Sequence, residues 1–360
     1  MRAGLLEGMR VLDLGIWRPV PYATQLLVEM GAEVLKVEPP GGDPMRVFPE
    51  LFAVLNAGKR SIEVDLKRPE GVAEVLSLAT DADALLEGFR PGVADRLGVG
   101  YQAVSGVNSA IVYCSISGYG AEGPLAKTPG HDINYQATAG VLRPRGGRPA
   151  FGSLPVGDLG AGMTAAMATV ASWARARATG EGERVDIGIA DVLATWTGAV
   201  GQLTPVGSDV PMNGLPGYGV YVTADDRWVT LGVLTEGPFW SGLCRALGLE
   251  HLDGVDLAAR VARKHELDAA VADAIAERTF DEVVTTLEDH DVPVSAVLDR
   301  AEMLGLDHFR LRGTVITDSQ VLGDGVPVMG HPARYLRHPA RPPGRVPEVP
   351  DGSVGGWETR

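Results

Sequence analysis

Cysteine is scarce in this chain of 360 residues, because only Cys114 and Cys244 occur and they do not form a CxxC pair. So few cysteines exclude a disulfide-stapled scaffold and indicate a reducing compartment. Long apolar runs are missing as well, since no stretch reaches the ~18 residues that a membrane-spanning helix needs. We therefore expect a cytoplasmic protein without a signal peptide or a membrane partner.

Several short catalytic motifs are also absent. No two histidines stand four residues apart and no cysteine pair has ligand spacing, which argues against a metal site. The chain has no Gly-x-Ser-x-Gly elbow and no phosphate-cradling Gly-x-x-x-x-Gly-Lys-Ser/Thr loop, so hydrolases and nucleotide-triphosphatases that use them are disfavoured. The net charge of −14 argues against a nucleic-acid partner, but an anionic ligand held by a local basic cluster is compatible with it.

Residues 118–123 match the Gly-x-Gly-x-x-Gly pattern of dinucleotide-binding loops and follow an apolar run. Pro124 and Pro129 come next, however, so no long helix opens there to receive a pyrophosphate. The acidic residue that the fingerprint requires about 20 positions later is missing too. We therefore expect a glycine-rich loop and no nicotinamide or flavin cofactor.

The first half of the chain alternates between short apolar strands and amphipathic helices. A strand, a helix and a second strand within about 30 residues form a βαβ unit, which implies parallel strands and a right-handed crossover. The expected strands are 9–15, 34–38, 61–66, 84–87, 110–116 and 185–189, and the expected helices are 21–31, 69–79 and 162–178. Residues 1–200 are thus predicted to form a large α/β domain with a parallel sheet.

The second half has a different pattern, which begins after a Gly/Pro-rich linker at 201–220. Two short strands around an Asp225-Asp226 turn predict a β-hairpin. Further elements are expected as helices at 238–247, 256–276 and 280–289 and a strand at 293–297. Residues 221–315 are predicted to form a smaller α+β domain, and the Pro- and Arg-rich segment 316–360 to return to the large domain.

Two segments place an ionisable side chain beside glycine: 130–135 contains His131, and 157–160 contains Asp158. A base and a carboxylate on opposite sides of a small substrate can remove a proton on one face and return one on the other. The same aspartate can instead act as a nucleophile. Two plainer interpretations are open, in which His131 is a structural loop residue and Asp158 caps the following helix.

Basic residues lie at the ends of several expected strands, at Lys59-Arg60, Lys67-Arg68 and Arg90. Open parallel sheets bind ligands in the loops that follow their strands, where Arg and Lys meet phosphates. These side chains are therefore either phosphate ligands or ordinary solvated charge.

Together, these segments resemble the family III CoA-transferases, and within them the α-methylacyl-CoA racemase branch. The resemblance keeps the same order along nearly the whole chain. It rests on residues 8–14, 31–39, 59–61 with 65–67, 87–93, 117–124, 130–135 and 157–158. A match this long favours the functional interpretations of His131, Asp158 and the basic residues over the plainer ones.

The resemblance implies an interlocked homodimer in which each chain has a large Rossmann-like domain and a small domain. CoA would lie on the large domain, with its acyl end toward the small domain of the partner chain. Arg90 would bind the CoA phosphates, and Asp158 matches the catalytic aspartate of the family. No cofactor beyond the CoA of the acyl-CoA substrate is implied. The other residues of the expected CoA site are Lys59, Arg60, Asp65, Leu66, Lys67, Asp132 and Tyr135.

The branch depends on His131, because similar transferases commonly carry an aromatic residue there whereas racemases carry histidine. Racemases also place a glutamate after the small-domain hairpin, and Glu236 supplies it one residue later than expected. The glycine run typical of transferases is missing from 213–219, whereas Glu38 before Pro39 is the commoner transferase form. His131, Glu236 and the missing glycine run outweigh Glu38, so the sequence favours the racemase.

The racemase hypothesis is a 1,1-proton transfer through the enolate of a 2-methylacyl-CoA. His131 and Asp158 act on opposite faces of the α-carbon, Glu236 orients His131, and the backbone N–H of Asp132 stabilises the enolate oxygen. The alternative is a CoA-transferase in which Asp158 forms an acyl anhydride and then an aspartyl-CoA thioester. A non-catalytic CoA-binding protein is the third class. The sequence does not specify the acyl group.

Overall fold

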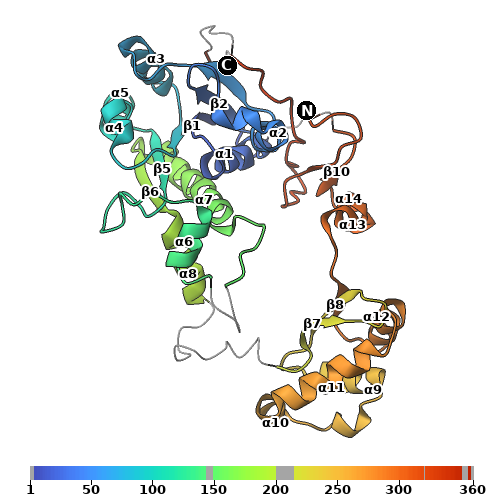
Figure 1. Ribbon diagram of the computed structural model, residues 1–360. Helices are drawn as coiled ribbons and strands as arrows, with labels where there is room; N and C mark the ends of the chain where they lie inside the picture. The colour runs from blue at the N-terminus through green and yellow to red at the C-terminus, as the bar shows by residue number, and fades with distance from the viewer. Residues whose placement is uncertain (1–3, 143–148, 200–214, 320, 351–355, 358–360) are drawn as a thin grey trace. The chain divides into compact units, whose positions relative to one another are not determined.

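The computed structural model in Figure 1 describes residues 4–142, 149–199, 215–319, 321–350 and 356–357. Its contacts divide the chain into two compact units: unit 1 comprises Met1–Gly198 and Leu306–Arg360, and unit 2 comprises Ala199–Gly305. Most of the expected linker, 201–214, lies outside the described residues. Residues 306–315, which we expected in the second domain, belong to unit 1.

Unit 1 is built around a parallel sheet of six strands, which confirms the predicted α/β fold. The strands are β1 (Arg10–Leu14), β2 (Glu33–Glu38), β3 (Arg60–Glu63), β4 (Ala84–Glu87), β5 (Val112–Ser117) and β6 (Glu183–Gly188). Their order across the sheet is β3-β2-β1-β4-β5-β6, so the direction of winding changes between β1 and β4. Open parallel sheets bind ligands at such a switch point, beyond the carboxyl ends of the strands.

Helices cover both faces of this sheet (Figure 1). α1 and α7 pack against one face, and α3 and α5 pack against the other. Each of α1, α2 and α3 has proline in its first turn, where the missing N–H costs nothing. The helices are α1 (Pro19–Glu29), α2 (Pro49–Asn56), α3 (Pro69–Ala79), α4 (Val93–Leu97), α5 (Tyr101–Val107), α6 (Asp132–Thr138), α7 (Val156–Thr179) and α8 (Ile189–Ala199).

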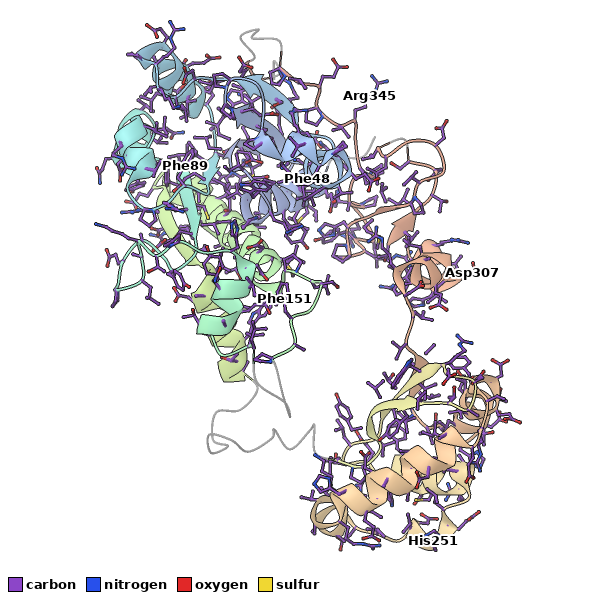
Figure 2. The ribbon with its side chains drawn as sticks, in the orientation of Figure 1. Phe48, Phe89, Phe151, His251, Asp307 and Arg345 are labelled. Atoms are coloured by element: carbon purple, nitrogen blue, oxygen red, sulfur yellow. The ribbon has the colours of Figure 1, made fainter. Side chains whose placement is uncertain are left out.

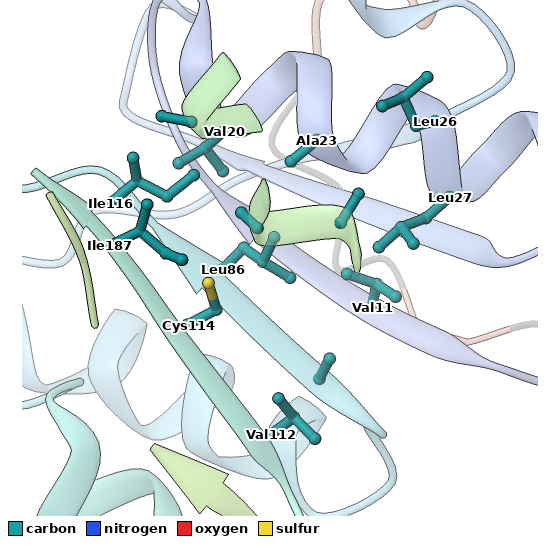
Figure 3. Packing of buried hydrophobic residues seen from close by; sticks show 14 of the residues in the cluster. Val11, Val20, Ala23, Leu26, Leu27, Leu86, Val112, Cys114, Ile116 and Ile187 are labelled. Carbon is teal, nitrogen blue, oxygen red and sulfur yellow. The ribbon is translucent and has the colours of Figure 1, made fainter. Parts of the chain in front are cut away.

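The core of unit 1 lies on both faces of the sheet, because neighbouring strand residues point to opposite sides. Val11 and Leu12, adjacent in β1, accordingly belong to different buried clusters. Figure 3 shows the cluster under α1, where Leu27 of the helix lies near Val11 of β1. Cys114 of β5 is fully buried in the same cluster, and burial raises the pKa of its thiol to about 12. The thiol is therefore an inert core group, as its apolar surroundings in the sequence predict.

Helix α7 begins at Val156, well before the start that we predicted at Gly162. Glycines in this stretch look like helix breakers in the sequence, yet they are points of close contact. A Cβ on Gly162 would lie 2.8 Å from the Pro19 carbonyl oxygen, and one on Gly160 would lie 2.5 Å from the Trp196 ring. The close packing that glycine permits outweighs its low helix propensity.

A network of buried charges lies under the loop between β1 and α1. The Lys59 ammonium donates to Asp13 Oδ2 at 2.9 Å and to the Thr24 hydroxyl at 2.8 Å. Asp13 Oδ1 accepts the Gly15 N–H at 2.8 Å, and the Lys36 ammonium donates to the Gly15 carbonyl at 2.6 Å. Both polar backbone groups of Gly15 are therefore held by buried charges, which fixes the path of the loop.

Replacing Lys59 with methionine is expected to lower the free energy of unfolding by about 3–5 kcal/mol, because Asp13 loses its buried partner. Urea unfolding at neutral pH measures the change. The exposed Lys127, changed to methionine in the same way, is the matched control and should alter the free energy by less than about 0.5 kcal/mol. Equal stability of the two variants would show that the network does not stabilise the fold.

Unit 2 has an antiparallel sheet in the order β7-β8-β9, with helices packed on it. Its elements are β7 (Tyr218–Val222), β8 (Trp228–Gly232), α9 (Gly237–Leu247), α10 (Leu257–Ala262), α11 (Lys264–Ala276), α12 (Phe280–Asp289), β9 (Val294–Ala296) and α13 (Arg300–Gly305). Asp226 has a φ of 58°, which fits the predicted turn between β7 and β8. The helix that we expected at 256–276 is instead two helices, α10 and α11, which meet at Arg263.

The C-terminal segment packs against the first part of unit 1. It contains α14 (Asp307–Leu311) and the antiparallel pair β10 (Val315–Ile316) and β11 (Val328–Met329). The Gly58 N–H donates to the carbonyl of Arg345, which Figure 2 labels, at 2.7 Å, and the Arg341 N–H donates to the Glu29 carbonyl at 2.6 Å. Across the described parts of both units, no helix is long and apolar enough to cross a membrane.

Candidate active site

The starts of α6 and α7 are joined by the carboxylate of Asp132. This side chain is buried, and its Oδ1 accepts the backbone N–H groups of Gly157 at 2.8 Å and Asp158 at 3.0 Å. Its other oxygen accepts a hydrogen bond from Gln136. Asp132 therefore caps α7 from outside the helix, where Pro155 at the N-cap position offers no side-chain acceptor. The capping role that one interpretation gave to Asp158 belongs to Asp132.

Asp158 is the third residue of α7, and its carboxylate faces the Arg18 guanidinium at 4.0 Å. Only 16% of the side chain is exposed. Burial and the like charge of Asp132 raise the pKa of Asp158 to about 6, whereas Arg18 opposes the shift. The carboxylate is therefore ionised at neutral pH but takes up a proton at little cost. Both nucleophilic and acid–base chemistry require such a group.

His131 is exposed and occupies the N-cap position of α6, directly before Asp132. The backbone N–H of His131 donates to Asn134 Oδ1 at 3.0 Å, and the Tyr135 hydroxyl donates to the Gly130 carbonyl at 2.6 Å. Both bonds fix the backbone around His131 and leave the imidazole outside the buried core. Because Asp132 accepts hydrogen bonds from the start of α7, the segments 130–135 and 157–160, which the sequence predicts to act together, are in contact.

Tyr135 also explains the glycine-rich loop after β5. Its ring is buried, and a Cβ on Gly118 would lie 2.4 Å from it. The Tyr119 ring packs edge-on against it at 5.2 Å between centroids. Gly118, the first glycine of this pattern, thus makes room for Tyr135, which we had expected in the CoA site. The tyrosine positions the loop that carries His131.

Replacing Asp132 with asparagine is expected to move the acid limb of the pH–rate profile to lower pH. The amide oxygen still accepts the α7 N–H groups, but the like charge that helps to raise the pKa of Asp158 is gone. Asp158 is then ionised at lower pH, and the ionised form is the one that both base and nucleophile chemistry use. Asp256, which caps α10 through the Ala259 N–H, is the matched control, and its asparagine variant should keep the profile unchanged. An unchanged acid limb in the Asp132 variant would contradict this electrostatic coupling.

A pocket of about 500 Å³ lies at the switch point of the sheet. Residues at the carboxyl ends of β1 and β2 line it together with the loops after β3 and β4. Its walls are largely apolar, with Leu14, Val37, Pro39 and Phe89 among them, and Figure 2 labels Phe89. Glu38 also lines the pocket, and although burial opposes its ionisation, hydrogen bonds from Arg46 and Ser61 hold the pKa of Glu38 below its usual value.

The predicted CoA-binding residues fall into two groups. Asp65, Leu66 and Lys67 line the large pocket, and Arg90 lines an adjoining cleft that shares Phe89 with it. Lys67 and Arg90 are both exposed there, where an anion can approach them.

Lys59 and Arg60 do not join these residues. The Lys59 ammonium is fully buried, and all the partners described above are groups of the protein itself. Arg60 begins β3, whereas Lys67 lies beyond the carboxyl end of that strand, and Arg60 pairs with Glu33 at 3.1 Å. The sequence does not distinguish Lys59 and Arg60 from Lys67, because a pair of basic residues stands both at the start of β3 and after its end.

Glu236 belongs to unit 2, where it is exposed at the N-cap position of α9. Its Oε2 accepts the Leu234 N–H at 3.2 Å, and the buried Arg260 donates to the Leu234 carbonyl at 2.9 Å. The turn that carries Glu236 is therefore well fixed within unit 2. Its proximity to His131 stays a prediction.

Two neighbouring residues of the β1–α1 loop were missed by sequence reasoning. Arg18 faces Asp158, and Trp17 has a φ of 62° with 44% of its side chain exposed. A non-glycine residue in this left-handed backbone conformation costs roughly 1–2 kcal/mol, and such strain is concentrated at functional sites. No local pattern marks either residue, because their positions depend on the buried charges beneath the loop.

A family model agrees with this geometry. The model of CoA-transferase family III matches residues 6–351. The chain belongs to CoA-transferase family III. Among its relatives, the succinyl-CoA–D-citramalate CoA-transferase of Chloroflexus aurantiacus is 32% identical, covering 86% of this chain and 83% of its own. The α-methylacyl-CoA racemase of Homo sapiens is 31% identical, with coverage of 88% and 83%.

Two solved structures share the fold of this chain. Rv3272 from M. tuberculosis is 27% identical with a TM-score of 0.88, covering 98% of this chain and 99% of its own. A CAIB/BAIF family protein from Brucella suis is 26% identical with a TM-score of 0.84 and coverage of 97% of both chains. Since a transferase and a racemase match this chain about equally well, identity alone does not choose between the two reactions.

Proposed function

We propose that this family III enzyme is a racemase that inverts the α-carbon of 2-methylacyl-CoA thioesters. One observation carries the proposal: His131 stands next to the aspartate whose carboxylate holds the backbone of Asp158. An exposed imidazole and a shielded carboxylate are thereby supported by one local hydrogen-bond assembly. A two-base reaction needs this pairing, whereas a nucleophilic mechanism needs only Asp158.

The reaction begins when neutral His131 removes the α-proton of the thioester from one face. The electron pair moves to the thioester oxygen to form an enolate, and protonated Asp158 delivers a proton to the opposite face. The reverse reaction exchanges the two roles. Asp158 suits this cycle because its pKa of about 6 lets it hold or release a proton near neutral pH.

The enolate oxygen requires hydrogen-bond donors. We propose that the backbone N–H of Asp132 supplies one, since it is the first residue of α6 and donates to no acceptor within the described residues. In the proposed interlocked homodimer, Glu236 of the partner subunit orients His131 and raises its basicity. Replacing Glu236 with glutamine, which changes both subunits, would then lower turnover and leave CoA binding unchanged.

We propose that CoA binds at the switch point of the sheet. The apolar walls of the large pocket suit the flat adenine ring, with Asp65 and Leu66 beside it. Lys67 and Arg90 then reach the phosphates from the neighbouring loops. Proton transfer through an enolate needs no further cofactor, so CoA arrives and leaves as part of the substrate.

A CoA-transferase is the second candidate, favoured by Glu38 before Pro39 and by transferase relatives at 30–32% identity. In that reaction Asp158 attacks the thioester carbonyl, forms a mixed anhydride and expels the CoA thiolate. The thiolate then attacks the aspartyl carbonyl, which gives aspartyl-CoA and releases the first acid. The acceptor carboxylate next displaces CoA from Asp158, and the thiolate returns to the new acyl group.

Trapping of covalent intermediates separates the two candidates. The enzyme is incubated with 2-methylacyl-CoA and an acceptor acid such as succinate, with hydroxylamine added, and its peptides are analysed by mass spectrometry. The racemase leaves Asp158 unmodified and forms no succinyl-CoA. A hydroxamate at Asp158 together with succinyl-CoA would identify the transferase instead.

A further inference from the structure

A groove of about 290 Å³ runs along one face of α1. Arg18, Tyr22, Gln25 and Glu29 line it at the spacing of a single helical face. At ~1.5 Å per residue, this row of side chains extends over about 16 Å. The groove therefore follows the helix axis over this length.

Apolar side chains close the groove on its other sides. α2 contributes Val54 and Leu55, and the C-terminal segment contributes Val328, Met329 and Pro332. All these residues belong to unit 1. A concave site with apolar walls and a few polar groups is typical of a pocket for a small molecule.

One end of the groove lies beside Asp158. Leu159, the next residue of α7, lines the groove, and so does Arg18, whose guanidinium is 4.0 Å from Asp158 Oδ2. A thioester whose α-carbon is at Asp158 can therefore extend its acyl chain past Arg18 and along α1.

The other end carries two buried polar side chains. Gln25 is 4% exposed and Glu29 is 8% exposed, and the bond between them, from Gln25 Nε2 to Glu29 Oε1, is long at 3.4 Å. Gln25 Oε1 accepts no hydrogen bond from any residue that the structure describes. Burial raises the pKa of Glu29 to about 7, so a large share of this side chain is protonated at neutral pH. A ligand group that satisfies both side chains gains more here than on an exposed surface.

We propose that this groove binds the acyl chain of the substrate and that Gln25 and Glu29 select a chain with a hydroxyl group at its far end. The proposal rests on the racemase function given above. The hydroxyl donates to Gln25 Oε1 and accepts from the protonated carboxyl of Glu29. A terminal methyl group leaves Gln25 Oε1 without a partner, and a terminal carboxylate is repelled by the ionised fraction of Glu29.

Binding measurements test this selectivity without relying on turnover. The probes are 10-hydroxy-2-methyldecanoyl-CoA and 2-methyldecanoyl-CoA, each titrated calorimetrically into the full-length protein. The hydroxylated thioester should bind about tenfold more tightly, which corresponds to the ~1.4 kcal/mol of one or two buried hydrogen bonds. Replacing Gln25 with leucine should remove this preference, because the plain chain then no longer leaves the Gln25 carbonyl oxygen without a partner. The exposed Gln102 of α5, changed to leucine, is the matched control and should retain the preference.

Moving the hydroxyl along the chain gives a second test that needs no variant. A 4-hydroxy isomer places the group between the apolar walls and should bind no better than the plain thioester. Equal affinity for all three thioesters, or a preference that survives the Gln25 substitution, would overturn the proposed selectivity. If the 10-hydroxy chain is preferred but neither thioester exchanges its α-proton, the groove stands and the racemase function fails.

Discussion

Replacing His131 with alanine should lower the rate of α-proton exchange by about 10²–10⁴-fold, which is the contribution expected of a positioned general base. The imidazole is exposed, and the bonds that fix this residue come from its backbone to Asn134. The substitution therefore removes the proton acceptor on one face and keeps the loop in place. Rates are measured by deuterium uptake into a 2-methylacyl-CoA, with CoA affinity determined in parallel.

The control for this variant is His265, an exposed histidine of α11, which should tolerate alanine without a change in rate. The result also separates the two candidate reactions. A transferase that uses Asp158 as its nucleophile keeps substantial turnover without His131, because the imidazole takes no part in anhydride formation. Turnover retained within about tenfold would contradict the two-base mechanism.

Replacing Asp158 with asparagine should abolish both reactions, with a fall in rate of at least about 10³-fold, because an amide neither accepts the α-proton nor attacks a thioester. The fold should not suffer. Burial raises the folded-state pKa of Asp158 from 3.8 to about 6, so its ionised form destabilises the native state above that pH. The neutral amide removes this cost, and the variant should be at least as stable as the original at pH 8.

Stability and activity are therefore expected to change in opposite directions in the Asp158 variant. Urea unfolding at pH 8 and at pH 5 measures the stability. The gain in free energy of unfolding should be smaller at pH 5, where Asp158 of the original protein is mostly protonated. Asp281, in the first turn of α12, is the matched control for an aspartate near a helix start. An Asp158 variant that unfolds more easily and stays active would assign Asp158 a structural role.

Local sequence patterns predict much of unit 1 because short-range physics determines it. The helix predicted at 69–79 and the strand predicted at 84–87 have these bounds in the structure. In both, the hydrophobic period agrees with the local signals: proline starts α3, and a short apolar run forms a fully buried strand. The start of α7 was predicted too late because the glycines that favour a loop locally are required for packing against α1 and α8.

The candidate site also has features that local sequence predicts and features that depend on tertiary contacts. The pairing of His131 with Asp158 could be proposed from the sequence because each residue type suggests its chemistry. The contact that joins their segments could not, because it connects Asp132 to N–H groups 25 and 26 residues further along the chain. The burial of Lys59 was equally hidden, since its partner Asp13 is 46 residues away. Contacts of this kind depend on the tertiary fold rather than on local periodicity.

The central claim is that this enzyme moves the α-proton of an acyl-CoA. The most direct test uses one enantiomer of 2-methyldecanoyl-CoA in heavy water, with mass spectrometry for deuterium and chiral chromatography for configuration. We predict that a single deuterium enters the α-position and that the product approaches an equal mixture of both enantiomers, without any acceptor acid. Retention of both configuration and the α-proton, with CoA transferred only when an acceptor acid is present, would contradict the account.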